Sequence, residues 1–178
     1  MHIGPYSLHH QVFAAPMAGV TDRPFRMLCK QLGAAYAVSE MVTSRKDLWD
    51  SLKTSRRANH EGEPGPIAVQ IAGTDASMMA EAAVYNIERG AQIIDINMGC
   101  PVRKVCRVGG GSAMMTDLAR TAALVRGMVE AVRIPVTAKM RLGWDDDNLT
   151  APDLARALED VGVAAIFVHG RTRQQGFG

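Results

Sequence analysis

The stretch QIIDINMGCPVRKV, residues 92–105, decides the fold, because in it an apolar run leads directly into a reactive turn. The run Ile93-Ile94-Asp95-Ile96 has the length and composition of a strand that is covered on both faces. Gly99 and Pro101 then impose a turn around the cysteine between them. We therefore place Cys100 at the carboxyl end of a buried strand.

Similar apolar runs recur along the chain, and helical patterns separate them. Strands are predicted at residues 11–15, 35–39, 67–71, 92–97, 136–140 and 164–169. Helices are predicted at residues 24–32, 46–52, 76–89, 117–132 and 152–161. Thr74-Asp75, Thr116-Asp117 and Thr150 with Pro152 supply amino-terminal caps, while Gly33, Gly90 and Gly162 suit the left-handed residue after a helix. Strands that alternate with helices predict an α/β fold with a parallel sheet.

Two architectures fit this alternation, a doubly wound sheet and a (β/α)8 TIM barrel. The segment after the first strand, residues 15–22, lacks the glycine-rich phosphate fingerprint of the doubly wound fold. Polar or reactive residues instead follow nearly every strand: Pro16-Met17, Glu40, Gln70, residues 97–100, residues 139–141 and residues 169–171. A barrel assembles its site from many strand ends, so we predict a TIM barrel. Since a barrel takes about 250 residues, we expect one that is truncated after about the sixth strand.

Composition and charge place the chain among ordinary globular proteins. Hydrophobic residues make up 47% of the chain and charged residues 21%, and the net charge of +2 does not by itself indicate a nucleic-acid partner. Three cysteines without C-x-x-C spacing favour a reducing compartment over a disulfide framework or a zinc site. The longest apolar run, residues 161–168, is far shorter than the roughly 20 residues of a membrane span. We expect a cytoplasmic protein without a metal and without membrane contact.

Cys100 is the strongest catalytic candidate among the three cysteines. At a strand end it can act as a nucleophile or as a proton donor. Arg103 and Lys104 are near enough in sequence to lower the pKa of its thiol or to attract a phosphate. Cys29 lies in a helical pattern and Cys106 lies further into the loop, so both are interpreted as small buried residues.

Three other strand ends carry candidate ligand-binding side chains. Lys139 and Arg141 point to the same side of their strand, and Lys139 suits either a Schiff base or the stabilisation of negative charge. His169 ends the sixth predicted strand and can donate to a ligand. Gln70 offers an amide that can recognise the edge of a heterocycle. The glycine-rich residues 109–112 are predicted to form a flexible loop over the site.

Five motifs, taken together, give the chain a recognisable family character. They are APMAGVTD at 15–22, SEM at 39–41, NMGCPVRKV at 97–105, KMRLGW at 139–144 and HGRTR at 169–173. With these motifs in order along nearly the whole chain, it resembles the tRNA-dihydrouridine synthases, and most closely their bacterial B-type branch. That resemblance implies an FMN-containing TIM barrel followed by a small helical domain that grips tRNA.

The resemblance also implies a role for each cofactor-binding candidate. The backbone of Pro16, Met17 and Ala18 would line the FMN. Gln70 would hydrogen-bond the pyrimidine edge of the flavin ring. Lys139 would stand beside its N1–C2=O side, and His169 would also contact the cofactor; all six assignments come from the family.

The reaction implied by the family is reduction of the uridine C5=C6 bond in tRNA, with NADPH as the reductant of FMN. Cys100 matches the active-site cysteine and would donate the proton to C5. Asn97 and Arg141 would belong to the wall that faces the substrate. The base would leave its stack to reach the flavin.

The family pattern further implies which parts lie outside this chain. Residues 1–178 would be the N-terminal portion of the FMN-binding barrel, without its last strands and without the helical tRNA-binding domain. In the family, loops after the last two strands hold the flavin phosphate. We therefore expect residues 1–178 by themselves to be inactive, and the full-length enzyme to be a monomer.

Two other functions stay open on the residues alone. One is a flavin-dependent TIM-barrel dehydrogenase of a free pyrimidine, which would be indifferent to tRNA. The other is a Schiff-base aldolase that uses Lys139 and no flavin.

Overall fold

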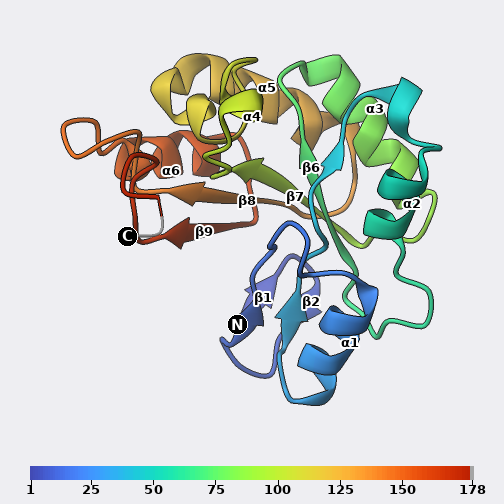
Figure 1. Ribbon diagram of the computed structural model, residues 1–178. Helices are drawn as coiled ribbons and strands as arrows, with labels where there is room; N and C mark the ends of the chain where they lie inside the picture. The colour runs from blue at the N-terminus through green and yellow to red at the C-terminus, as the bar shows by residue number, and fades with distance from the viewer. Residues whose placement is uncertain (177–178) are drawn as a thin grey trace.

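A five-stranded parallel sheet forms the centre of the computed structural model, which describes residues 1–176 (Figure 1). The strands follow chain order and every neighbouring pair is parallel. They are β5 (Val42–Thr43), β6 (Ala68–Ala72), β7 (Ile93–Met98), β8 (Val136–Arg141) and β9 (Ala165–His169). This architecture confirms the predicted α/β class and is consistent with a truncated TIM barrel. The predicted domain, residues 1–178, includes two residues that lie outside the described part.

The second predicted strand is interrupted after a short first piece, β4 (Tyr36–Ala37). A single parallel bridge between Val38 and Ala68 joins this piece to β6. The hydroxyl of Ser39 then accepts a hydrogen bond from the backbone N–H of Gln70, at 3.1 Å. A side-chain oxygen thus takes the place of a backbone acceptor, and the chain rejoins the sheet only at β5.

An N-terminal hairpin, which the sequence patterns do not predict, precedes the first predicted strand. Its strands β1 (His2–Ile3) and β2 (Tyr6–Ser7) are antiparallel, whereas the next strand, β3 (Phe13–Ala14), is parallel to β4. Gly4 turns the hairpin with a φ of +55°, and a Cβ built there would clash with the ring of Pro135. The hairpin therefore requires glycine at this position and packs directly against the start of β8.

Four of the five predicted helices are confirmed, and one is wrong. The helices are α1 (Arg23–Gln31), α2 (Leu52–Ala58), α3 (Ala76–Ile87), α4 (Arg103–Cys106), α5 (Leu118–Ala131) and α6 (Ala151–Asp160), with 3-10 turns η1 (Lys46–Leu48) and η2 (Gly111–Thr116). The predicted helix 46–52 is replaced by η1 and by α2, because Ser51 accepts from the N–H of Thr54 and starts a new helix there. Within residues 1–176, each helix is too short or too polar to span a bilayer.

The predicted caps are mostly confirmed. Asp75 accepts from the N–H of Met78, and Asp117 accepts from the N–H of Arg120. Thr150 occupies the cap position of α6, but its hydroxyl donates to the carbonyl of Met115 instead. The three glycines predicted after helices, Gly33, Gly90 and Gly162, have φ values of +104°, +102° and +93°.

Two apolar cores lie on opposite faces of the sheet. The larger core is formed by strand residues such as Ile94, Ile96 and Met140, which pack against α3, α5 and α6 (Figure 1). The smaller core lies on the other face, where Ile3 of the hairpin meets Tyr36 and other side chains. Because successive strand residues point to opposite faces, the sheet separates a helix-covered face from an inner face.

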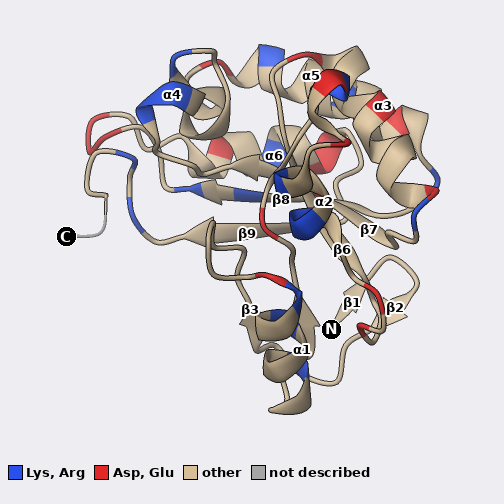
Figure 2. Ribbon diagram, turned by 45° about the vertical axis from the view of Figure 1, so that its right-hand side comes forward, with Lys and Arg blue, Asp and Glu red and all other residues tan. Residues whose placement is uncertain are grey.

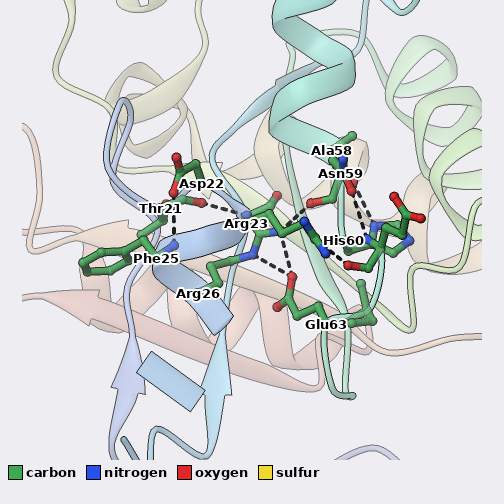
Figure 3. A network of polar contacts seen from close by, with 12 residues as sticks. Thr21, Asp22, Arg23, Phe25, Arg26, Ala58, Asn59, His60 and Glu63 are labelled. Carbon is green, nitrogen blue, oxygen red and sulfur yellow. Dashed lines mark hydrogen bonds and ion pairs between the residues drawn. The ribbon is translucent and has the colours of Figure 1, made fainter. Parts of the chain in front are cut away.

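A buried ionic cluster ties α1 to the loop that precedes β6 (Figure 3). The guanidinium of Arg26 contacts Glu63 at 2.8 Å, and the ammonium of Lys30 contacts the other oxygen of Glu63 at 2.9 Å. Arg26 also donates to the carbonyls of Thr21 and Asn59, both at 2.7 Å. The cluster thereby fixes the segment that follows β3 against the rest of the fold.

Candidate active site

Polar side chains occupy the inner face of the sheet near the carboxyl ends of the strands. Asp95 and Asn97 alternate along β7 with isoleucines of the helix-covered core, and the same alternation holds along β8. Strand register places Asn97 beside Lys139, and Arg141 beside His169. The structure thus brings together predicted site residues from three neighbouring strands.

Cys100 lies just beyond β7, on a turn that Asn97 organises. The side-chain oxygen of Asn97 accepts from the N–H of Gly99 at 3.3 Å and from the N–H of Cys100 at 3.0 Å. From the neighbouring strand, Nε of Arg141 donates to the carbonyl of Gly99 at 2.8 Å. Asn97 and Arg141 thus hold the turn in place, and Cys100 is half-buried on it.

The glycine-rich segment supports this turn from the other side and is not a flexible loop over the site. Gly111 and Ser112 are buried, and the N–H of Ser112 donates to the carbonyl of Cys100 at 3.0 Å. A Cβ at Gly111 would lie 2.5 Å from that carbonyl oxygen, and φ at Gly111 is +56°. Glycine is needed here because the backbones approach so closely.

Burial raises the pKa of the Cys100 thiol, and the nearby Cys106 adds to this effect. The N–H of Val102 and the charge of Arg141 act in the opposite direction but do not outweigh burial. Arg103 and Lys104 lie exposed on α4, so the prediction that they lower this pKa is wrong. A raised pKa keeps the thiol protonated at neutral pH.

Gln70 and Asn97 belong to a chain of hydrogen bonds that ends at Asp95. Nδ2 of Asn97 donates to Oε1 of Gln70 at 2.8 Å, and Nε2 of Gln70 donates to Oδ2 of Asp95 at 2.7 Å. Thr137 donates to the other Asp95 oxygen at 2.6 Å. Asp95 was not among the predicted site residues, although a carboxylate between isoleucines on a buried strand is a signal that could have identified it.

Lys139 on β8 and His169 on β9 both lie near the carboxyl ends of their strands. Burial lowers the pKa of Lys139, with the charge of Asp95 opposing this effect and that of Arg141 adding to it. The pKa of His169 is lowered by burial and by the cations Arg141, Lys139 and Arg171. His169 is accordingly neutral near pH 7, and it can donate one hydrogen bond from its ring.

The predicted segment Pro16-Met17-Ala18 forms a tight turn after β3. The carbonyl of Met17 accepts from the N–H groups of Val20 and Thr21, and the Thr21 hydroxyl accepts from the N–H of Met17. Met17 is 42% exposed, and Ala18 is exposed as well. The turn thus lies at the surface, with its exposed residues Met17 and Ala18 outside the core.

A glutamate from the segment between β4 and β5 holds this turn. Glu40, from the predicted SEM motif, accepts from the N–H of Gly19 and lies 3.8 Å from Nε of Arg57. The turn after the first strand is therefore tied to α2 through a buried carboxylate.

A cavity of about 250 Å³ opens on the inner face beside these groups. Pro16, Asp95 and Lys139 line it together with the aromatic rings of Phe13 and Phe167. A groove of about 450 Å³ on the outer side is lined instead by α5 and the segment after α4, including Arg107 and Arg120. Of the predicted site residues, Pro16 and Lys139 line the inner cavity, whereas Cys100, Gln70 and His169 do not.

Arg141 is almost fully buried, and its guanidinium contacts backbone carbonyls. Besides Gly99 it donates to the carbonyl of Thr172 at 3.0 Å and to that of Gly176 at 3.1 Å. It therefore holds the segment after β9 against the Cys100 turn. Within residues 1–176, no three His, Cys, Asp or Glu side chains are grouped so as to hold a metal ion.

Comparison with known proteins places the chain in a family. The family model described as "Dihydrouridine synthase (Dus)" matches residues 13–178. A tRNA-dihydrouridine synthase B of Xanthomonas axonopodis pv. citri is 55% identical over 175 residues, which are 98% of this chain and 53% of that protein. The protein of that name from Pseudomonas aeruginosa is 55% identical over 173 residues, covering 97% of this chain and 52% of its own length.

A third relative extends the likeness to another genus. The tRNA-dihydrouridine synthase B of Vibrio cholerae is 50% identical over 173 residues, covering 97% of this chain and 54% of that protein. The chain spans about half the length of these curated relatives. The resemblance inferred from the five sequence motifs is confirmed, and the chain belongs to the dihydrouridine synthase family.

Proposed function

We propose that the protein of which this chain forms at least a part reduces the C5=C6 bond of uridine in tRNA, with FMN as cofactor, NADPH as reductant and Cys100 as proton donor. The curated relatives carry the name of this activity, and the chain shares their family over nearly all of its length. In this proposal residues 1–178 form the N-terminal portion of the FMN-binding barrel. The alternatives of a free-pyrimidine dehydrogenase and a Schiff-base aldolase are weaker, because the family match is to enzymes named for tRNA.

The half-buried position of Cys100 on its fixed turn is the observation that carries the chemical part of the proposal. Burial raises the pKa of this thiol, so it is a poor thiolate nucleophile and a suitable general acid near neutral pH. Asn97 and Arg141 hold the turn on which it lies. Of the two roles that the sequence leaves open for Cys100, these facts favour proton donation.

The predicted cofactor-binding residues near the carboxyl ends of the strands fit FMN by the chemistry of their donors. Lys139 supplies a positive charge for the N1–C2=O side of a flavin ring, and His169 supplies a ring nitrogen. The side-chain amide of Gln70 donates one N–H to Asp95, and its second N–H would donate to the pyrimidine edge of the flavin ring. Pro16 lines the cavity, and Met17 and Ala18 continue from it as exposed residues of the same turn.

When bound, FMN would supply the hydride that the uracil ring accepts at C6, with NADPH as its reductant. Cys100 gives its thiol proton to C5, and the resulting thiolate regains a proton from solvent. Lys139 stabilises negative charge next to the cofactor throughout. Asn97 and Arg141 keep the Cys100 turn in the wall that faces the substrate.

The proposal is tested by replacing Cys100→Ala in the whole protein and measuring dihydrouridine in tRNA by nucleoside mass spectrometry. The change should slow dihydrouridine formation by about 100-fold or more, because a general acid is lost. The FMN content should stay the same, since the thiol is not among the groups proposed to hold the cofactor. Cys29→Ala, at a half-buried cysteine of α1, is the matched control and should keep its activity.

Substrate assays separate this function from its alternatives. Turnover of uridine in tRNA but not of free uracil supports the proposal, whereas the reverse preference identifies a free-pyrimidine dehydrogenase. A borohydride-trapped adduct on Lys139 would identify the aldolase. A Cys100→Ala enzyme with undiminished turnover would show that another group donates the proton.

A further inference from the structure

Asp95 is a fully buried carboxylate that the proposed reaction does not use. Its side chain has 0% exposure, yet it lines the inner cavity. The groups that face it come from three other strands: Tyr36 on β4, Gln70 on β6, and Thr137 and Lys139 on β8. Burying a charge in such a place costs free energy unless hydrogen bonds from partner groups compensate for the lost hydration.

The hydrogen bonds around Asp95 all run in one direction. Gln70 and Thr137 both donate to the carboxylate. Asn97 donates to Gln70, and the N–H groups of Gly99 and Cys100 donate to Asn97. Every donor along this path points from the Cys100 turn toward Asp95.

This common direction follows from the chemistry of the two ends. An ionised carboxylate only accepts hydrogen bonds, and a backbone N–H only donates. The two amides in between can each be turned by half a revolution, which exchanges their oxygen and nitrogen. With a carboxylate at one end and backbone N–H groups at the other, a single orientation of Gln70 and of Asn97 satisfies all the bonds.

We propose that Asp95 is a positioning residue, which fixes the amide orientations of Gln70 and Asn97 and thereby holds the turn that carries Cys100. Burial raises the pKa of Asp95 to about 6, so the group is ionised and purely accepting above neutral pH. The inference deepens the proposed function and rests on it where Cys100 is called a reacting group. The hydrogen bonds of the network join residues of this chain only.

The test measures how fast iodoacetamide alkylates Cys100 in the whole protein at pH 8, by mass spectrometry of the peptide that contains it. Asp95→Leu removes the acceptor, so the turn loosens and the half-buried thiol becomes accessible. Alkylation should then be about tenfold faster, as expected for the loss of one hydrogen bond to a charged group. Asp95→Asn should stay within about twofold of the unmodified protein, because its oxygen can face Gln70 while its NH2 donates to Thr137.

Exchanging the carboxylate of Asp95 and the amide of Gln70 gives a sharper test in the same alkylation assay. Gln70→Glu alone places two carboxylates face to face, and alkylation should again be about tenfold faster. In the double variant Asp95→Asn with Gln70→Glu, the carboxylate and the amide trade places, and every bond of the path can form again. The rate should return to within about twofold of the unmodified protein.

Thr137→Val is the matched control for a merely structural role. It removes a buried hydrogen bond to the same carboxylate, but that bond does not lead to Cys100. Its alkylation rate should stay unchanged. The inference is overturned if Asp95→Leu alkylates at the normal rate, if Thr137→Val accelerates as much, or if the double variant is no slower than Gln70→Glu.

The outcomes also distinguish this inference from the proposed function. If Asp95→Leu fails to fold, as judged by circular dichroism, the Gln70→Glu single and double variants still decide. Dihydrouridine formation by the unmodified protein tests the function separately. A protein that makes dihydrouridine but shows none of the alkylation changes would refute the role of Asp95 alone.

Discussion

At the scale of single residues, burial sets the protonation of Asp95, on β7, and of Cys100, on the turn that follows this strand. It raises the pKa of Cys100 and keeps that thiol protonated. It also raises the pKa of Asp95, but only to about 6, because Thr137, Gln70 and Lys139 favour the charged form. One segment therefore offers a proton donor and an ionised acceptor at the same pH.

Replacing Asp95→Asn should change how stability depends on pH. The pKa of Asp95 is about 6 in the folded protein against an ordinary 3.8, so the folded state binds its proton more tightly than the unfolded state does. The free energy of unfolding therefore falls as pH rises from about 4 to about 6, and the cost stays constant above that range. The Asn variant lacks this cost, which is at most about 3 kcal/mol.

Urea unfolding of the whole protein at a series of pH values measures the difference between the two proteins. The advantage of Asp95→Asn should grow between about pH 4 and pH 6 and then level off. Asp47→Asn is the control, because its exposed carboxylate beside Arg45 has a lowered pKa and should give a difference of the opposite sign. A constant difference across the whole range would contradict the prediction.

At the scale of elements, α1 carries the segment after β3 in a fixed position. Arg26 on α1 is buried against Glu63 and also binds the carbonyl of Thr21 (Figure 3). Thr21 in turn closes the turn that begins at Met17. The proposed FMN-facing backbone is thus held by a helix through a chain of buried polar contacts.

Arg26→Ala should destabilise the protein by about 3 to 5 kcal/mol, because it leaves Glu63 buried with only Lys30 to pair with it. Urea unfolding of the whole protein measures this loss. Arg156→Ala is the control, since the Arg156–Asp153 pair is exposed and such pairs contribute little. Equal effects of the two substitutions would show that burial of the Arg26–Glu63 pair is not what stabilises the segment.

At the scale of the whole molecule, some basic residues are paired with acidic side chains, and an exposed group on and after α4 is not paired within residues 1–176. Arg26, Lys30, Arg45, Arg57 and Arg156 form ion pairs with acidic side chains. The exposed side chains of Arg103, Lys104 and Arg107, on and directly after α4, make no ion pair or hydrogen bond with any residue in the part of the chain that the structure describes. Figure 2 shows the basic colour of α4 on the ribbon. These three residues follow directly on the Cys100 turn, so in the proposed function they lie where the tRNA backbone would approach.

Replacing Arg103, Lys104 and Arg107 by Gln should weaken tRNA binding to the whole protein in a salt-dependent way. If all three side chains neutralise phosphates, the slope of log affinity against log salt should decrease by about 2 to 3, close to 0.9 for each phosphate that is no longer neutralised. Fluorescence anisotropy with labelled tRNA at several salt concentrations measures the slope.

A triple Gln variant at Arg56, Arg126 and Arg133 is the matched control, because it removes the same charge at exposed positions away from the Cys100 turn. It should leave the slope nearly unchanged. Equal slopes for both triple variants would mean that α4 makes no special contact with the RNA.

The local patterns of the sequence determined the class of fold and most of its elements. Caps such as Asp75 and the glycine after α3 act within a few residues, so their effect can be predicted from neighbours alone. Each of the six apolar runs likewise overlaps a strand of the structure, whereas β5 and the hairpin strands β1 and β2 were not predicted. The turn after β7 singled out Cys100. The helix expected at 46–52 was wrong because Ser51 caps the next segment instead.

What only the tertiary structure decided is which side chains meet on the inner face. Asp95 receives its partners from positions 25 and 42 residues away in sequence, and the split of the second strand depends on a bond between Ser39 and Gln70, 31 residues apart. The raised pKa of Cys100, against the lowering expected from Arg103 and Lys104, also reflects burial by distant segments. Register between strands and exclusion of water are set by the packed fold as a whole, so no local pattern specifies them.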